Sequence, residues 1–237
     1  MSYLLIFVTT FSVGQNKHLN IGLQNSGVCL GNSKKHNGIR INFWDKDVSS
    51  YNGMNLSVYS SAIKSNGLGI GILMSNDSLS NGVRIGGIGV GGDYINGIAI
   101  GGLGVGASYK FNGLGISGFA MGADTMNGFF ISVIGTTNWS TRPIAIVNGV
   151  SIGAVGVITK ELNGVAIGFM NSADKQKGVA IGFGENSSQK CTGIQIGISN
   201  RTKTLFGLQI GLWNVIENKK FLKRTPLINF CFKRRSR

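Results

Sequence analysis

The chain has 237 residues, 42% of them hydrophobic, and a formal net charge of +14. That is enough apolar material for a substantial core. Glycine contributes 38 residues against two prolines, and the lack of a three-residue period excludes collagen. Because hardly any ten-residue window lacks a glycine, and each interior glycine costs a helix about 1 kcal/mol relative to alanine, long helices are excluded as well.

The first fourteen residues, MSYLLIFVTTFSVG, predict an exported protein. An apolar run from Leu4 to Val8 precedes Ser12 and Gly14, small residues at the positions that signal peptidase accepts. We therefore expect residues 1–14 to be a signal peptide. The usual Lys or Arg near the start is missing, so a start further upstream stays open, as does a buried first strand. No later run of 18 apolar residues predicts a transmembrane helix.

A repeat of about fifteen residues dominates the rest of the chain. Its alignment point is a glycine, preceded by asparagine in nine of twelve repeats, and ten of the eleven intervals are 14 to 16 residues long. The repeat glycines are Gly38, Gly53, Gly67, Gly82, Gly97, Gly113, Gly128, Gly149, Gly164, Gly178, Gly193 and Gly207. Asn-Gly suits a turn with positive φ, so each repeat predicts a turn, a short strand, a second glycine-marked bend and a polar connection.

Apolar residues alternate with small or polar ones after each repeat glycine, as in Val165, Ala166 and Ile167. A period of two is typical of a strand with one buried face. We therefore expect the two apolar positions of every repeat to stack inside a common core, and the residue between them to face solvent.

Two all-β architectures fit this repeat. In a β-solenoid of about twelve units, each repeat is one coil and equivalent positions stack in register. In a transmembrane β-barrel of about 12 strands, each repeat is one strand and one turn, and neighbouring strands run antiparallel. The uniform polar connections favour the solenoid, as do asparagines that recur after the strand at Asn171, Asn200 and Asn214, which stacked amide ladders require. The barrel remains the alternative, because Pro226–Phe232 resembles an aromatic-ended last barrel strand.

The predicted organisation has four parts. After the signal peptide we expect an N-terminal cap at residues 15–36, the glycine-rich repeats at 37–216, and a basic C-terminal cap or tail at 217–237. The interval from Gly128 to Gly149 is 21 residues and contains NWSTRP, which predicts a protruding loop carrying Trp139, Arg142 and Pro143. A tolerated insertion without a function is the alternative.

Three late repeats carry a resemblance to a known family: GVAIGFMN at 164–171, GIQIGISN at 193–200 and GLQIGLWN at 207–214. With these units the chain resembles a bacterial family of surface repeat-containing proteins, the leptospiral type. The resemblance spans about Gly38 to Phe232 and weakens in the earlier repeats. It implies export and surface display, and it brings no catalytic residues.

The residues offer little support for catalysis or for a bound cofactor or metal. Gly87-Ile-Gly89-Val-Gly-Gly92 matches a dinucleotide-binding turn, but no helical pattern follows it. Nine acids and two histidines form no triad or metal-ligand spacing, and the three cysteines form no CxxC pair. We therefore expect no catalytic, cofactor-binding or metal site, and hence no enzyme.

The charge distribution suggests the partners. Residues 219–237 hold eight Lys/Arg and no acid, which suits an anionic glycan, lipopolysaccharide or a membrane surface. Basic residues are not interleaved with aromatics as nucleic-acid binding would need. We expect a non-enzymatic exported protein of the cell surface, outer membrane or extracellular space of a Gram-negative-type bacterium, with a structural or interaction role. The alternative is an integral outer-membrane barrel that forms a pore or anchor. The candidate binding residues are Trp139, Arg142, Lys223, Arg224, Arg234 and Arg235.

Overall fold

The structure is a computed structural model that describes residues 18–136 and 145–232, and this described part is all-β. The chain forms two compact bodies, the N-terminal body (Met1–Leu103) and the C-terminal body (Gly104–Arg237). The N-terminal body contains β1 (His18–Ile21), β2 (Ser26–Gly31), β3 (Lys35–Ile41), β4 (Ser50–Gly86) and β5 (Gly89–Gly101). The C-terminal body contains β6 (Gly104–Ser117), β7 (Ala120–Gly122), β8 (Thr125–Ser132), β9 (Gly135–Thr136), β10 (Ile146–Ile216) and β11 (Arg224–Cys231).

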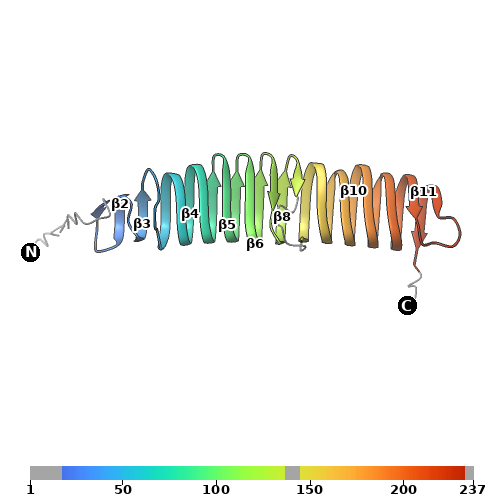
Figure 1. Cartoon of the computed structure of the whole chain (residues 1–237), viewed down its shortest axis with the longest axis horizontal. Helices are drawn as coiled ribbons and strands as arrows, with labels where there is room; N and C mark the ends of the chain where they lie inside the picture. Colours follow the sequence, from blue (N-terminus) through green and yellow to red (C-terminus); the bar gives the residue numbers. More distant parts are fainter. Residues whose placement is uncertain (1–17, 137–144, 233–237) are drawn as a thin grey trace, which may run out of the picture. The chain divides into compact units, whose positions relative to one another are not determined.

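The longest strand, β10, winds around an axis instead of running straight. It has 71 residues, which would span about 230 Å if fully extended, at about 3.3 Å per residue. Figure 1 shows its successive turns lying side by side. Each turn places its repeat glycine against the previous one, so that Gly164 lies on Gly149 and Gly178 lies on Gly164. We call each such turn a coil.

Neighbouring coils run parallel in both bodies. In the C-terminal body, β8 pairs in parallel with β6 and with β10, and its Gly128 is in register with Gly113 and Gly149. In the N-terminal body, Gly38 is in register with Gly27 and with Gly53. Parallel register is what stacked coils require, whereas strands around an antiparallel barrel would alternate in direction. The predicted solenoid class is confirmed.

The expected number of about twelve units in one stack is too high. The C-terminal body has seven coils, marked by the glycines Gly113, Gly128, Gly149, Gly164, Gly178, Gly193 and Gly207. The N-terminal body stacks a shorter series that begins at Gly27.

The Asn-Gly pair is explained by contacts between coils. The repeat glycines have φ between +110° and +147°, as the sequence predicted, and a Cβ on Gly164 would collide with the carbonyl oxygen of Gly149. Where successive repeats of one body both carry this asparagine, the later asparagine donates a hydrogen bond to the earlier one. These bonds are 2.6 to 3.0 Å long and link Asn37, Asn52, Asn66, Asn81 and Asn96 in one body, and Asn112, Asn127, Asn148 and Asn163 in the other.

The prediction that the repeated apolar residues fill the core is wrong. The position between them faces inward: Ala166 and Gln195 are fully buried, whereas Ile194 and Ile196 keep more than a third of their surface exposed. Alternation with period two defines two faces of a strand but does not say which face is inside. The inward position holds small residues in several coils, such as Ala99, Ala180 and Gly115, and larger ones in others, such as Gln195 and Phe130.

Polar side chains fill much of the remaining interior and satisfy one another along the axis. Asn171, Asn186, Asn200 and Asn214 form a ladder of amide hydrogen bonds of 2.8 to 2.9 Å, which confirms the predicted amide stacking. Gln176, Gln195 and Gln209 form a second ladder, with bonds of 2.8 and 3.0 Å. Because these amides donate to one another from coil to coil, burying them carries a smaller desolvation penalty than burying unpaired amides would.

The first and last described strands reverse direction. β1 pairs antiparallel with β2, and β11 pairs antiparallel with the end of β10. Each therefore covers the outer edge of a terminal coil, whose peptide groups would otherwise be open to pairing with another chain.

Candidate interaction surface

The outward rows of apolar side chains form a continuous surface on the C-terminal body. Counting from each repeat glycine, the first and third residues form two rows, and the fifth or sixth residue, at the bend, forms a third. We call this surface the apolar face. Its first row is Leu114, Phe129, Val150, Val165, Val179, Ile194 and Leu208; its second is Ile116, Ile131, Ile152, Ile167, Ile181, Ile196 and Ile210; its third is Phe119, Val133, Ile134, Val155, Phe169, Met170, Phe183, Ile198, Leu212 and Trp213.

Exposure rises from the strand rows to the row at the bend. Ile196 and Ile210 are 37% and 38% exposed, because each is flanked by the same side chain on adjacent coils, whereas Phe183 and Leu212 are 67% and 62% exposed. Soluble proteins rarely expose a contiguous apolar patch of this kind without a partner.

The last strand extends the apolar face. Ile228 of β11 pairs with Ile210, and Phe230 pairs with Leu208, so their side chains lie on the same side of the sheet. Both are 56% exposed, whereas Asn229 between them is buried beside Gln209. The end strand therefore keeps the polar-in, apolar-out order of the coils.

A lysine precedes the apolar face in five of the seven coils. Three or four residues before a repeat glycine lie the exposed side chains of Lys110, Lys160, Lys175, Lys190 and Lys203. Glu161 accepts a hydrogen bond from Lys175 at the surface, and this pairing lowers the pKa of Glu161 and raises that of Lys175. Read along one coil, the exposed positions change from cationic through asparagine to apolar.

The candidate binding residues from the sequence fall in two groups. Lys223 and Arg224 are exposed at the start of β11, where they join Lys219 and Lys220 in a basic end that contains no acid. Lys219 donates hydrogen bonds to the Asn229 side chain and the Phe230 carbonyl. The other four candidates, Trp139, Arg142, Arg234 and Arg235, lie outside the described residues.

A buried ionic network lies inside the N-terminal body. The Asp77 carboxylate lies 2.9 Å from Arg84 Nε and accepts hydrogen bonds from Ser65, at 2.7 Å, and from Tyr51, at 3.3 Å. Burial raises the pKa of Asp77, opposed by the Arg84 guanidinium. Burial, together with the Asp77 carboxylate, also raises the pKa of Tyr51. Gly69 makes room for the network, since a Cβ there would meet the Tyr51 hydroxyl and lie 3.0 Å from Arg84 Cδ.

A second buried pair follows the same scheme. Arg40 lies 2.9 Å from Asp45 and donates to Asn55, at 3.1 Å, and to Ser33, at 3.2 Å. Both arginines occupy the inward position between two apolar residues, where the sequence predicted exposure. Buried ion pairs such as these act in folding, since breaking one leaves an uncompensated buried charge. The sequence signal for these pairs was an aspartate near each arginine: Asp45 lies five residues after Arg40, and Asp77 lies seven residues before Arg84.

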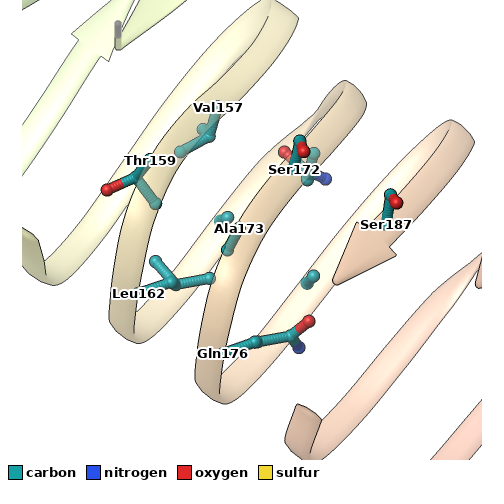
Figure 2. Close-up of a pocket in the computed structure, with 10 residues that line it drawn as sticks. Val157, Thr159, Leu162, Ser172, Ala173, Gln176 and Ser187 are labelled. Carbon is teal, nitrogen blue, oxygen red and sulfur yellow. The ribbon is translucent and has the colours of Figure 1, made fainter. Parts of the chain in front are cut away.

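The interior of β10 contains a small cavity of about 10 Å³, bordered by Val157, Leu162, Ala173 and Gln176 among others. Figure 2 shows these side chains projecting from neighbouring coils toward one another. The volume is at the lower limit for a single water molecule, so the cavity is a packing gap between coils and cannot hold a substrate.

In the described part of the chain, the His, Cys, Asp and Glu side chains do not cluster into a metal site. Within residues 18–136 and 145–232 no three His, Cys, Asp or Glu side chains are close enough to hold a metal ion. Cys191 packs with Leu205 and Ile216, and burial raises the pKa of its thiol to about 12. In the same described residues no helix has the length and hydrophobicity to span a membrane.

Fold and surface together define a β-solenoid repeat protein with a polar interior and an amphipathic exterior. Comparison with known proteins adds no relative: no protein-family model, no curated protein and no solved structure matches this chain.

Proposed function

We propose that this chain is a non-enzymatic, exported surface repeat protein whose solenoid serves a structural and interaction role, with its basic end binding an anionic glycan or lipopolysaccharide. Residues 1–14 act as the signal peptide in this proposal, and display at the cell surface or outer membrane of a Gram-negative-type bacterium agrees with the resemblance of its repeats to leptospiral-type surface proteins.

The observation that carries the proposal is the basic end. Lys219, Lys220, Lys223 and Arg224 lie within six residues with no acid among them, and the last three are exposed. Clustered cations on a rigid stack of coils raise the local concentration of polyanions and hold several anionic groups at once.

Binding to heparin and to lipopolysaccharide tests the proposal. Replacing Lys220, Lys223 and Arg224 with glutamine is expected to weaken binding about tenfold at low salt and to reduce its salt dependence. Lys34, Lys46 and Lys64 are exposed in the N-terminal body, so their triple glutamine variant has the same net charge and serves as the control. Equal loss in both variants would show that only net charge matters, and the proposed role of the basic end would be wrong.

A further inference from the structure

We propose that the apolar face of the C-terminal body binds the surface of a lipid bilayer that carries anionic headgroups. This inference goes beyond the proposed function and uses a different surface from the basic end, so either can fail without the other.

The first argument is the continuity of the apolar face. Its three rows run through all seven coils, with an apolar residue at every position named above, and Ile228 and Phe230 continue two of the rows onto β11. Six coil spacings at about 4.8 Å make the face roughly 29 Å long. A site for a small ligand would need a concave shape, whereas a long row of projecting side chains suits an extended partner.

The second argument is the direction of the backbone hydrogen bonds. They run from coil to coil, as from Leu208 and Ile210 to the paired residues of β11, and therefore lie within the sheet. The face presents side chains to its partner and no unpaired peptide groups, so contact with the acyl region carries little backbone desolvation cost.

Charge selects the bilayer over a second copy of the chain. Without residues 219–237, which include the basic end, the C-terminal body has 8 Lys/Arg and 5 Asp/Glu, a net charge of +3. Two such bodies placed face to face would repel each other, whereas anionic headgroups attract them. Each of the last four coils has an exposed lysine three or four residues before its repeat glycine: Lys160, Lys175, Lys190 and Lys203. Their long side chains can reach headgroups while the apolar rows contact acyl chains.

The third row has the composition expected at a membrane interface. Phe169, Phe183 and Trp213 project from three of the last four bends and are 54%, 67% and 59% exposed. Aromatic side chains, tryptophan above all, favour the boundary between headgroups and acyl chains. If only these side chains enter the interface, the coils rest on the surface of the bilayer without spanning it.

Vesicle flotation with the full chain tests the inference. We expect the chain to float with vesicles of phosphatidylcholine and phosphatidylglycerol in equal parts, and much less with phosphatidylcholine alone. Replacing Phe169, Phe183, Ile198 and Leu212 with serine is expected to reduce the bound fraction at least about tenfold, since each loses most of the transfer free energy of a large apolar side chain.

Two isoleucines of similar exposure provide the matched control. Ile198, on the apolar face, is 56% exposed, and Ile158, which projects from the coil between buried Val157 and Thr159, is 60% exposed. Ile198→Ser should weaken vesicle binding about threefold or more, whereas Ile158→Ser should leave it unchanged. Equal effects would overturn the inference.

Tryptophan fluorescence keeps the test independent of how well the serine variants fold. The chain has three tryptophans, so replacing Trp44 and Trp139 with phenylalanine leaves Trp213 as the only reporter. Its emission should shift to shorter wavelength when anionic vesicles are added, and an unchanged spectrum would overturn the inference. So would a stable dimer without vesicles that the serine substitutions dissociate, because the face would then be an interface between copies.

Discussion

At the scale of single residues, the inward position at Gly115 has little room. Gly115 occupies that position between Leu114 and Ile116, and a Cβ there would lie 2.8 Å from the ring of Phe111 and 3.0 Å from that of Phe130. The two rings already pack edge to face with centroids 5.0 Å apart. The glycine is therefore required by side-chain packing, and not by its backbone angle.

We expect Gly115→Ala to lower the free energy of unfolding by about 1–3 kcal/mol, the usual cost of overpacking. Gly106→Ala is the control, because the nearest atom to a Cβ there is a carbonyl oxygen 4.0 Å away, and it should change stability by less than about 1 kcal/mol. Urea denaturation followed by circular dichroism measures both. Similar losses in the two variants would contradict the packing explanation.

Cys191 predicts a dependence of stability on alkaline pH. Burial raises the pKa of its thiol from 9.0 to about 12, so below pH 9 both folded and unfolded chains keep the proton. Between these values only the unfolded chain loses it, and stability falls by up to about 1.4 kcal/mol per pH unit. Comparing denaturation curves below pH 9 and about two units higher, we expect Cys191→Ala to lose less stability than the native chain.

At the scale of elements, side-chain ladders hold successive coils of β10 in register. Asn200 donates to Asn214 and to the Ile210 carbonyl, at 2.8 and 2.9 Å, and accepts from Asn186 at 2.8 Å. All three asparagines are fully buried. Removing the Asn200 amide takes a hydrogen-bond donor from the Asn214 side-chain oxygen and from the Ile210 carbonyl.

Asn200→Ala should therefore destabilise the C-terminal body by roughly 2–4 kcal/mol, from two unsatisfied buried groups. Asn163→Ala is the matched change: Asn163 is half-buried and ends its ladder with one bond of 2.8 Å to Asn148, so its loss should cost about 1 kcal/mol or less. Hydrogen exchange of the flanking coils locates the effect. If Asn163→Ala proved the costlier change, the interior ladder would not be what fixes the register.

At the scale of the whole molecule, the end strands decide whether the chain stays separate from its neighbours. β11 covers Gly207–Val215 through an antiparallel pairing in which Ile228 is opposite Ile210. At the other end, β1 covers β2 in the same way, with Ile21 opposite Val28. Parallel coils could otherwise continue by adding a second chain, as open sheet edges do.

Truncation after Ile216 should therefore cause self-association, because the last coil would then present a free edge. Truncation after Phe232 retains β11 and should leave the oligomeric state of the chain unchanged. Light scattering of the purified variants measures the difference. A truncated chain that remained monomeric would show that β11 does not protect the edge.

The repeat and the solenoid class could be predicted from the sequence because each coil copies the same local chemistry. The positive φ of Gly164 and the ladder through Asn200 both follow from residue type and a constant interval. The direction of the side chains could not, since Val165, Ala166 and Ile167 alternate in the same way whichever side is inside. The small size of Ala166 and the recurrence of Gln195 and Gln209 fourteen residues apart were the available signals for a narrow, polar interior.

The interval between Gly128 and Gly149 has a practical consequence. These glycines are direct partners in the sheet even though 21 residues separate them, and Gly135 and Gly156 are paired as well. The hydrogen-bond register between neighbouring coils is therefore kept even where the connecting chain is longer than in the other repeats. A foreign peptide inserted between Thr136 and Ala145 should therefore leave the pairing of Gly128 with Gly149 intact, which makes this interval a practical place for an epitope tag.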